Sequence, residues 1–297
     1  GAYNVAVGNN AMQYSTAGFG NVAVGANCLA FGFPGAFYLN TAGGFGSMII
    51  NNIGSYNTAW GSYSLTANIS GIGNTAIGYA ALVLNTVELY NTAVGYAALS
   101  LPNGGFNTAI GYNTQAPAGV FNFVGGYFSR ALGLNDVAIG YNVTANGLGS
   151  VSIGNTSIAS QVGSVAIGSA AQALGTAAIA IGSPAVSPSI SSIAIGDIAT
   201  AGGDFSIAIG TTSLVAPAGE KSISMGLNAT CLQSLDVAIG AEAASRGIEC
   251  TAVGFETNCA GNGCTAVGSL IASSGEASTA LGHVIEASGG AVVAIGN

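Results

Sequence analysis

The sequence is poor in charged residues. Only 14 of its 297 residues are Asp, Glu, Lys or Arg, and three of these are basic. A soluble domain ordinarily carries about 25% charged residues. So few basic side chains exclude a nucleic-acid binder, which needs a positive surface to neutralise phosphates. One histidine and singly scattered carboxylates also argue against an acid–base enzyme.

Long apolar runs are missing as well, although half of the residues are hydrophobic. Gly, Ser, Asn and Thr interrupt every run before the roughly 18 residues that a membrane-spanning helix needs, so we expect no such span. The chain shows no signal peptide after Gly1 and stops just beyond a repeat glycine, which predicts a segment of a longer fibre. Its apolar content is too high for a disordered chain.

Glycine, by contrast, is abundant and regularly placed. The motif x-Ala-x-Gly or a close variant ends at Gly8, Gly25, Gly44, Gly61, Gly78, Gly95, Gly111, Gly126, Gly140, Gly154, Gly168, Gly182, Gly196, Gly210, Gly226, Gly240, Gly254, Gly268, Gly282 and Gly296. The spacing is 17 to 19 residues at first, falls through 16 and 15, and is then 14 apart from one interval of 16. Short regular periods are typical of a solenoid in which each repeat is one coil.

Residues around each glycine predict two short strands per coil. Large β-branched residues stand three and one before the glycine with a small residue between them, which is the alternation of a strand. We expect this column to form the structural core: Val165, Ile167, Ile179, Ile181, Ile193 and Ile195. Small pairs such as Ala171 with Ala173 and Ala199 with Ala201 follow each glycine and predict a second strand. The glycine is expected to allow positive φ at the corner.

Such a narrow coil leaves most of its surface in water. Because that surface is rich in Ala, Ser, Gly and Thr rather than in charge, we expect several chains to pack side by side, and three is the natural number for a fibre.

The unit Ser164–Ala173, Ser-Val-Ala-Ile-Gly followed by Ala-x-Ala, resembles the head repeat of trimeric autotransporter adhesins, the YadA-like head. The resemblance covers residues 127–297, where the coils have 14 residues. It implies an all-β, left-handed parallel β-roll, a homotrimer, display outside the cell and an adhesive function. Residues 1–126 look like a longer relative with coils of 15 to 19 residues, for example Asn74–Leu82 and Asn91–Leu99. Similar units occur in bacterial surface proteins and viral tail fibres.

Aromatic residues concentrate in the first part of the chain. All but Phe205 and Phe255 lie at or before Tyr141. One column directly follows the motif glycine and comprises Tyr79, Tyr96, Tyr112, Tyr127 and Tyr141. This strip either packs against neighbouring chains or stacks on sugars or a host protein. The segment carrying Phe31, Phe33, Phe37 and Tyr38 falls in the longest interval, and we expect it either to bulge as a binding loop or to fold back as core.

Asparagines form a second column, four residues before the glycine. We expect a stacked amide ladder that satisfies turn backbone groups, formed by Asn4, Asn21, Asn40, Asn57, Asn74, Asn91, Asn107 and Asn122.

The five cysteines show no zinc spacing, and we predict no metal or other cofactor. Cys250 and Cys264 occupy the same place in adjacent coils, a separation of about 4.8 Å that is marginal for a disulfide. Cys231 and Cys259 are expected to be small buried residues. Four glycosylation sequons begin at Asn68, Asn142, Asn155 and Asn228.

Three hypotheses for function follow. The first is a structural and adhesive segment of an extracellular trimeric fibre, on a cell or a virion, that attaches multivalently to a host protein, the extracellular matrix or a glycan. The second is an ice-binding solenoid that uses the threonine column Thr41, Thr58, Thr75, Thr92 and Thr108. The third, a fibre-borne glycan hydrolase, needs paired carboxylates that the nearly uncharged first part does not supply.

Overall fold

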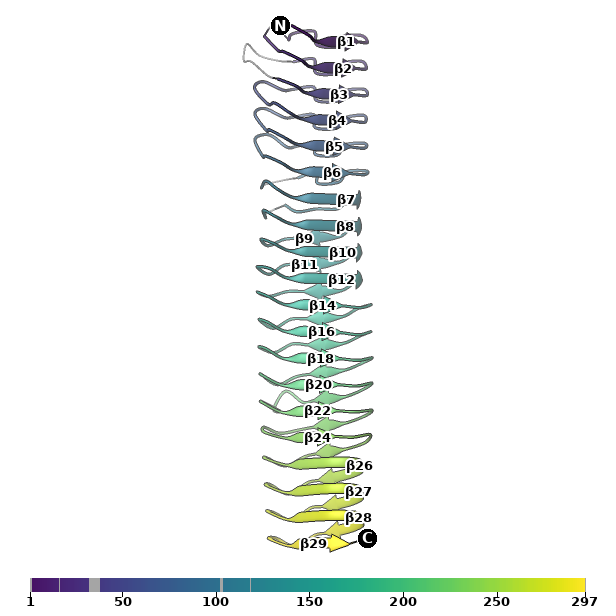
Figure 1. The fold of residues 1–297 in the computed structure, drawn as a ribbon, viewed down its shortest axis with the longest axis vertical. Helices are drawn as coiled ribbons and strands as arrows, with labels where there is room; N and C mark the ends of the chain where they lie inside the picture. The colour runs from purple at the N-terminus through teal and green to yellow at the C-terminus, as the bar shows by residue number, and fades with distance from the viewer. Residues whose placement is uncertain (1, 16, 32–37, 102–103, 118, 297) are drawn as a thin grey trace. The chain divides into compact units, whose positions relative to one another are not determined.

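The chain is an all-β parallel solenoid of about 20 turns (Figure 1). The structure, a computed structural model, describes residues 2–15, 17–31, 38–101, 104–117 and 119–296. It divides into two compact units, Gly1–Gly149 and Ser150–Asn297. The change of repeat length predicted at 126/127 is a separate feature, since the coils up to Gly149 belong to the first unit.

In the first unit, each coil contributes one short strand that ends near the motif glycine. These strands are β1 (Val5–Val7), β2 (Val22–Val24), β3 (Thr41–Gly43), β4 (Thr58–Trp60), β5 (Thr75–Ile77), β6 (Thr92–Val94), β7 (Thr108–Tyr112), β8 (Phe123–Tyr127) and β10 (Val137–Tyr141). A second strand per coil begins only with β9 (Arg130–Ala131) and β11 (Thr144–Ala145). Before β9, turns occupy the place of the second strand.

The second unit has two strands per coil. The first strands are β12 (Val151–Asn155), β14 (Val165–Ile167), β16 (Ile179–Ile181), β18 (Ile193–Ile195), β20 (Ile207–Ile209), β22 (Ile223–Met225) and β24 (Val237–Ile239). The second strands are β13 (Ile158–Ala159), β15 (Gln172–Ala173), β17 (Val186–Ser187), β19 (Thr200–Ala201), β21 (Leu214–Val215), β23 (Thr230–Cys231) and β25 (Ala244–Ser245). The last coils contain β26 (Thr251–Cys259), β27 (Thr265–Ser273), β28 (Thr279–Ala287) and β29 (Val293–Gly296).

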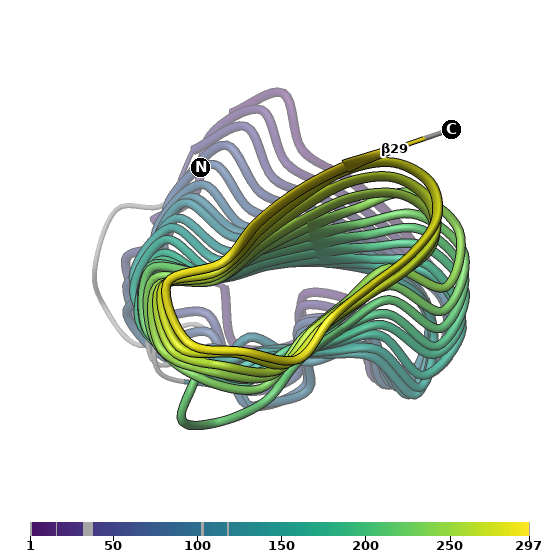
Figure 2. The ribbon, with the colours of Figure 1, turned by 90° about the horizontal axis from the view of Figure 1, so that it is seen from below.

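All pairs are parallel and keep equivalent residues in register. Ala166 pairs with Ala180 and Ala180 with Ala194 in the second unit, as Ala76 pairs with Ala93 in the first. Because each residue lies directly over its counterpart, identical side chains form columns. The view along the coils shows the closed, flattened outline of each turn (Figure 2).

The predicted core is wrong in one respect. Val165, Ile167, Ile179, Ile181, Ile193 and Ile195 are only half-buried, whereas the alanines between them are fully buried. The alternation of the strand was correct, but the faces were assigned the wrong way round. The small pairs of the second strand, such as Ala171 with Ala173, also point inward. Two facing rows of alanine fill the interior of a 14-residue coil, so the larger residues lie on its outer side.

The longer coils of the first unit enclose bulkier residues. Their buried core adds a column four residues after the motif glycine, made of Leu29, Met48, Leu65, Leu82 and Leu99. The longer repeat and the larger interior therefore occur together, because three more residues per coil widen the outline enough to hold a leucine.

Candidate functional site

The half-buried Val and Ile columns make an apolar outer face along the first strands of the second unit. From β12 to β20 the first three residues of each first strand are half-buried, buried and half-buried, as in Ile179–Ile181 and Ile193–Ile195, and in β22 and β24 the third residue is exposed. None of the first strands from β12 to β24 contains a charged residue. An apolar stripe of this length, continuous over successive coils, is typical of an interaction surface.

The tyrosine column of the first unit is a stack of rings. The centroids of successive rings from Tyr79 to Tyr141 lie 4.8–5.3 Å apart, with interplanar angles of 3–16°. These side chains are 40–53% exposed. Because neighbouring rings cover each other's faces, the column presents ring edges and phenolic oxygens to a partner. Within the stack, no room is left for a sugar between the rings.

A second aromatic column was missed in the sequence. Phe106 stacks on Tyr90 at 5.1 Å and on Phe121 at 5.0 Å. All three adopt positive φ, between 55° and 61°, and all three directly precede an asparagine of the amide ladder. The signal was therefore present as repeated aromatic-Asn pairs, including Tyr3-Asn4 and Tyr56-Asn57.

The predicted binding loop is described in part. Phe33 and Phe37 lie outside the described residues. Phe31 stacks on Tyr14 at a centroid distance of 5.2 Å, and Tyr38 forms a parallel bridge with Phe19. Both side chains are more than 40% exposed, so the ends of this segment carry aromatic surface.

The amide ladder is present and runs inside the first unit. The backbone N–H of Asn57 donates to Asn40 Oδ1 at 3.0 Å, and the N–H of Asn74 donates to Asn57 Oδ1 at 2.9 Å. Asn57 Nδ2 also donates to the carbonyl of Gly71 at 2.8 Å. The ladder therefore satisfies turn backbone groups from coil to coil.

Asn68 is fully buried in a parallel row, donating to Asn51 Oδ1 and the Gly71 carbonyl, so its sequon is inaccessible. Asn142, Asn155 and Asn228 are exposed.

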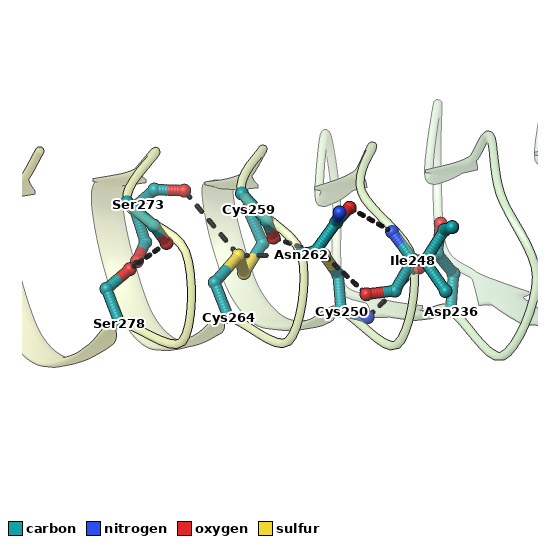
Figure 3. The surroundings of a disulfide bond; sticks show 10 residues. Asp236, Ile248, Cys250, Cys259, Asn262, Cys264, Ser273 and Ser278 are labelled. Atoms are coloured by element: carbon teal, nitrogen blue, oxygen red, sulfur yellow. Dashed lines mark hydrogen bonds between the residues drawn. A yellow bond between two sulfur atoms is a disulfide. The ribbon is translucent and has the colours of Figure 1, made fainter. Parts of the chain in front are cut away.

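Three cysteines meet in the interior of the second unit (Figure 3). The disulfide joins Cys259 to Cys264, with Cα atoms 6.0 Å apart. Cys259 is fully buried as predicted, and its disulfide was not anticipated. Cys250 and Cys264 do stack, with Sγ atoms 3.7 Å apart, but Cys250 keeps a free thiol. The disulfide joins two different positions of the repeat, because Cys259 ends β26 and Cys264 directly precedes β27. Comparing equivalent positions in successive coils does not reveal such a pair.

The free thiols are buried and of low acidity. Burial raises the pKa of Cys231 to about 12, and the nearby Asp236 carboxylate adds to the shift. Burial likewise raises the pKa of Cys28 to about 11 and that of Cys250 above its usual value. With Cys259 and Cys264 tied in a disulfide, this cluster offers a single thiol, which is too few for a structural metal site.

In-register columns of stacked residues, with interiors of alanine, define a parallel β-solenoid repeat protein. Within this class, a family profile for the YadA head domain repeat matches residues 131–157, 145–171, 159–184 and 189–213. The matched windows lie within the predicted 127–297 and cover less than half of the chain. They confirm the predicted resemblance for these residues: the chain carries YadA-type head repeats.

A crystal structure of the collagen-binding domain of the Yersinia adhesin YadA is 26% identical to the chain. The match covers 60% of this chain and 72% of that one, with a TM-score of 0.27. Since that TM-score reflects a poor superposition, the fold assignment rests on the strand register given above. No curated protein matches the chain. Among the described residues, no helix is long and apolar enough to cross a membrane.

Proposed function

We propose that the chain is a segment of an extracellular adhesive fibre in which three copies pack side by side. The observation that carries this proposal is the outward apolar face of the first strands, in a stretch whose sequence matches YadA head repeats. In a single chain this face is half in water. Packing against equivalent faces of two other copies removes it from water, which stabilises the assembly by about 25 cal/mol per Å² of apolar surface.

The assembled fibre would hold repeated surface columns at a distance from its carrier. Each coil presents nearly the same outer residues as the next, and three chains multiply the copies. Weak contacts to a host protein, the extracellular matrix or a glycan then add up through effective concentration. The exposed aromatic columns of the first unit are the surfaces we assign to such contacts, through ring edges and phenolic oxygens.

The test has two parts, assembly and attachment. Sedimentation of the purified chain is expected to give about three times the chain mass of 28.7 kDa. The same material is then passed over immobilised matrix proteins and a glycan array, with monomeric chain at equal concentration as the control. Trimer retained on at least one surface and monomer retained less is the expected result. A monomer that never assembles, or a trimer retained nowhere, would contradict the proposal.

A further inference from the structure

A cavity of about 330 Å³ opens at the place in the first unit where the coils change type. Above it, the coil containing β6 turns at Tyr96–Leu99 without a second strand, and below it the coil of β8 continues into β9. Residues from three successive coils line it, among them Leu101, Gln115, Phe128 and Arg130. The cavity thus lies at the step between a wide coil and a narrow one.

Arg130 brings the charge to this cavity. It is the sole basic residue before Lys221 in the sequence. Its side chain is exposed, and no carboxylate of the described residues lies within ion-pair distance of it. Glu88, the nearest acid before it in sequence, accepts hydrogen bonds from the backbone N–H groups of Thr86 and Val87 instead. The guanidinium is thus an unpaired fork of donors that suits a carboxylate or a sulfate.

The amide side chain of Gln115 lies beside Arg130 at the cavity. Gln115 forms a parallel bridge with Arg130, so both side chains leave the same side of the coil. Gln115 Nε2 donates to Asn113 Oδ1 at 2.7 Å, to Ser100 Oγ at 3.0 Å and to the carbonyl of Ala97 at 3.3 Å. Its Oε1 is buried without a hydrogen-bond partner. Gln115 therefore holds Asn113 and Ser100 in place at the cavity and keeps an acceptor unused.

Phe128 adds an aromatic ring to the lining of the cavity. Phe128 lies 4.6 Å from Tyr127 at 88° and 5.5 Å from Tyr112 at 74°, in edge contacts. Both faces of Tyr127 are covered by Tyr112 and Tyr141, so Phe128 meets the edge of the tyrosine stack and turns its other side to the cavity. Phe128 and Leu101 both line the cavity and give it apolar surface of the kind on which the C–H face of a sugar ring packs.

Within the first unit, the cavity lies beside β9 and not beside the first strands β7 and β8, none of whose residues line it. Ala131 is buried in the coil interior, so its neighbour Arg130 points outward from the second strand. Ala138, in the first strand of the next coil, is buried in the same interior. β9 therefore lies across the coil from β10, so packing through the first strands of this unit would leave the cavity open.

We propose that this cavity binds a single acidic sugar, with its anionic group on Arg130, its hydroxyls on Asn113 and Ser100, which Gln115 positions, and its ring against Phe128. An anion alone would not need the amide row or the aromatic ring, and an acidic peptide side chain would leave the row of hydrogen-bonding groups unused. The inference deepens the proposed function by naming an acidic glycan as a ligand class, and it rests on that function only for the outward display of the site.

Saturation-transfer NMR on the purified, assembled chain tests the proposal with small probes. These are methyl β-D-glucuronide, glucose 6-sulfate and neutral methyl β-D-glucoside, with acetyl-Asp-Glu-amide as the peptide probe. We expect the glucuronide or the sulfate to bind with a dissociation constant of about 1 mM, ordinary for one monosaccharide. Arg130→Gln is expected to weaken it about tenfold. Arg246→Gln, which removes an exposed arginine from the second unit, is the matched control and keeps full binding.

The outcomes separate cleanly. Preference for the glucuronide assigns the anion as carboxylate and preference for glucose 6-sulfate as sulfate, and both support an acidic sugar. Equal binding of the neutral glucoside, unchanged binding by Arg130→Gln, stronger binding of the peptide, or no transfer to any probe overturns the inference. If the fibre binds the sugar but attaches to no surface, the proposed function is wrong and the sugar site is retained. If the fibre binds no sugar and attaches to a surface equally well with Arg130→Gln, the sugar site is wrong and the proposed function is retained.

Discussion

The motif glycines are the positions at which the coil tolerates substitution least. At Gly168, φ is +135°, a region that side chains rarely adopt. A Cβ built there would lie 2.2 Å from the carbonyl oxygen of Gly182 in the next coil. The other corners differ, because many are left-handed turns occupied by ordinary residues, such as Ala170 at 56° and Ala177 at 54°. Positive φ alone therefore does not demand glycine in this fold, whereas contact between stacked corners does.

Gly168→Ala is expected to lower the free energy of unfolding by about 3 kcal/mol or more, since it combines backbone strain with a clash against backbone. Gly163→Ala is the control: φ there is +65° and a Cβ would meet nothing within 4 Å, so the loss is about 1 kcal/mol. Chemical denaturation of both variants measures the difference. Equal losses would show that the corner contact is unimportant.

The cysteines allow a second prediction at this scale. Because the thiolate is the reactive form, buried thiols of raised pKa such as Cys231 and Cys28 should resist iodoacetamide at pH 8 in the folded chain. Mass spectrometry is expected to count no added groups on the folded chain. In guanidinium it should count three on the chain with its disulfide intact, in line with one disulfide and three free cysteines, and five after reduction. Five groups without reduction would mean that Cys259 and Cys264 are not joined.

At the scale of strands and columns, stacking converts one favourable contact into many. The asparagine ladder is the clearest case, since Asn57 bonds both a turn carbonyl and a backbone N–H of the next coil. Removing Asn57 leaves the N–H of Asn74 without its acceptor, whereas the carbonyl of Gly71 keeps Asn68 Nδ2 as a donor. We expect Asn57→Ala to cost about 2 kcal/mol, because a buried orphan group costs about 1–3 kcal/mol. Thermal unfolding measures this loss, with Asn146→Ala, a substitution of an exposed asparagine, as the control. A midpoint for Asn57→Ala equal to that control would remove the ladder from the list of stabilising features.

The repeat itself was readable from the sequence because solenoid columns are visible as sequence periods. Strand positions, parallel register and the amide ladder all follow from equal spacing of Gly and Asn. The side of the coil on which a residue lies was not readable in the same way, since alternation fixes two faces but not which is inside. Ile167 was assigned to the core, and Ala166 occupies it. The deciding quantity is the width of the coil, which depends on how corners such as Ala170 and Gly168 turn.

In the candidate sites, too, some features could be predicted from the sequence and others could not. The tyrosine column could be predicted because one position repeats, but its ring faces are used within the column, which only the ring geometry reveals. The Cys259–Cys264 disulfide joins two different positions of the repeat, so period counting favoured Cys250 instead. The cavity beside Arg130 arises from a defect in periodicity, and an irregularity in coil type carries little signal beyond the change in spacing.

At the scale of the whole molecule, the question is what covers the apolar face of the first strands. Ile195 stands in the middle of that face, paired above with Ile181 and below with Ile209, and it is half-buried in the single chain. A buried carboxylate without a partner is costly, but on the outer side of the coil it is costly only when another chain covers it. Ile195→Asp should therefore leave the coil folded and remove the assembly.

The expected result is a fall from about three times the chain mass to 28.7 kDa in sedimentation, with an unchanged circular dichroism spectrum. Thr200→Asp adds the same charge at an outward position of the second strand, across the coil, and should keep the assembled mass. If Thr200→Asp dissociates the particle and Ile195→Asp does not, the second unit packs through its second strands and the proposed assembly face is wrong. The pair of variants thus decides which face of the second unit joins the chains.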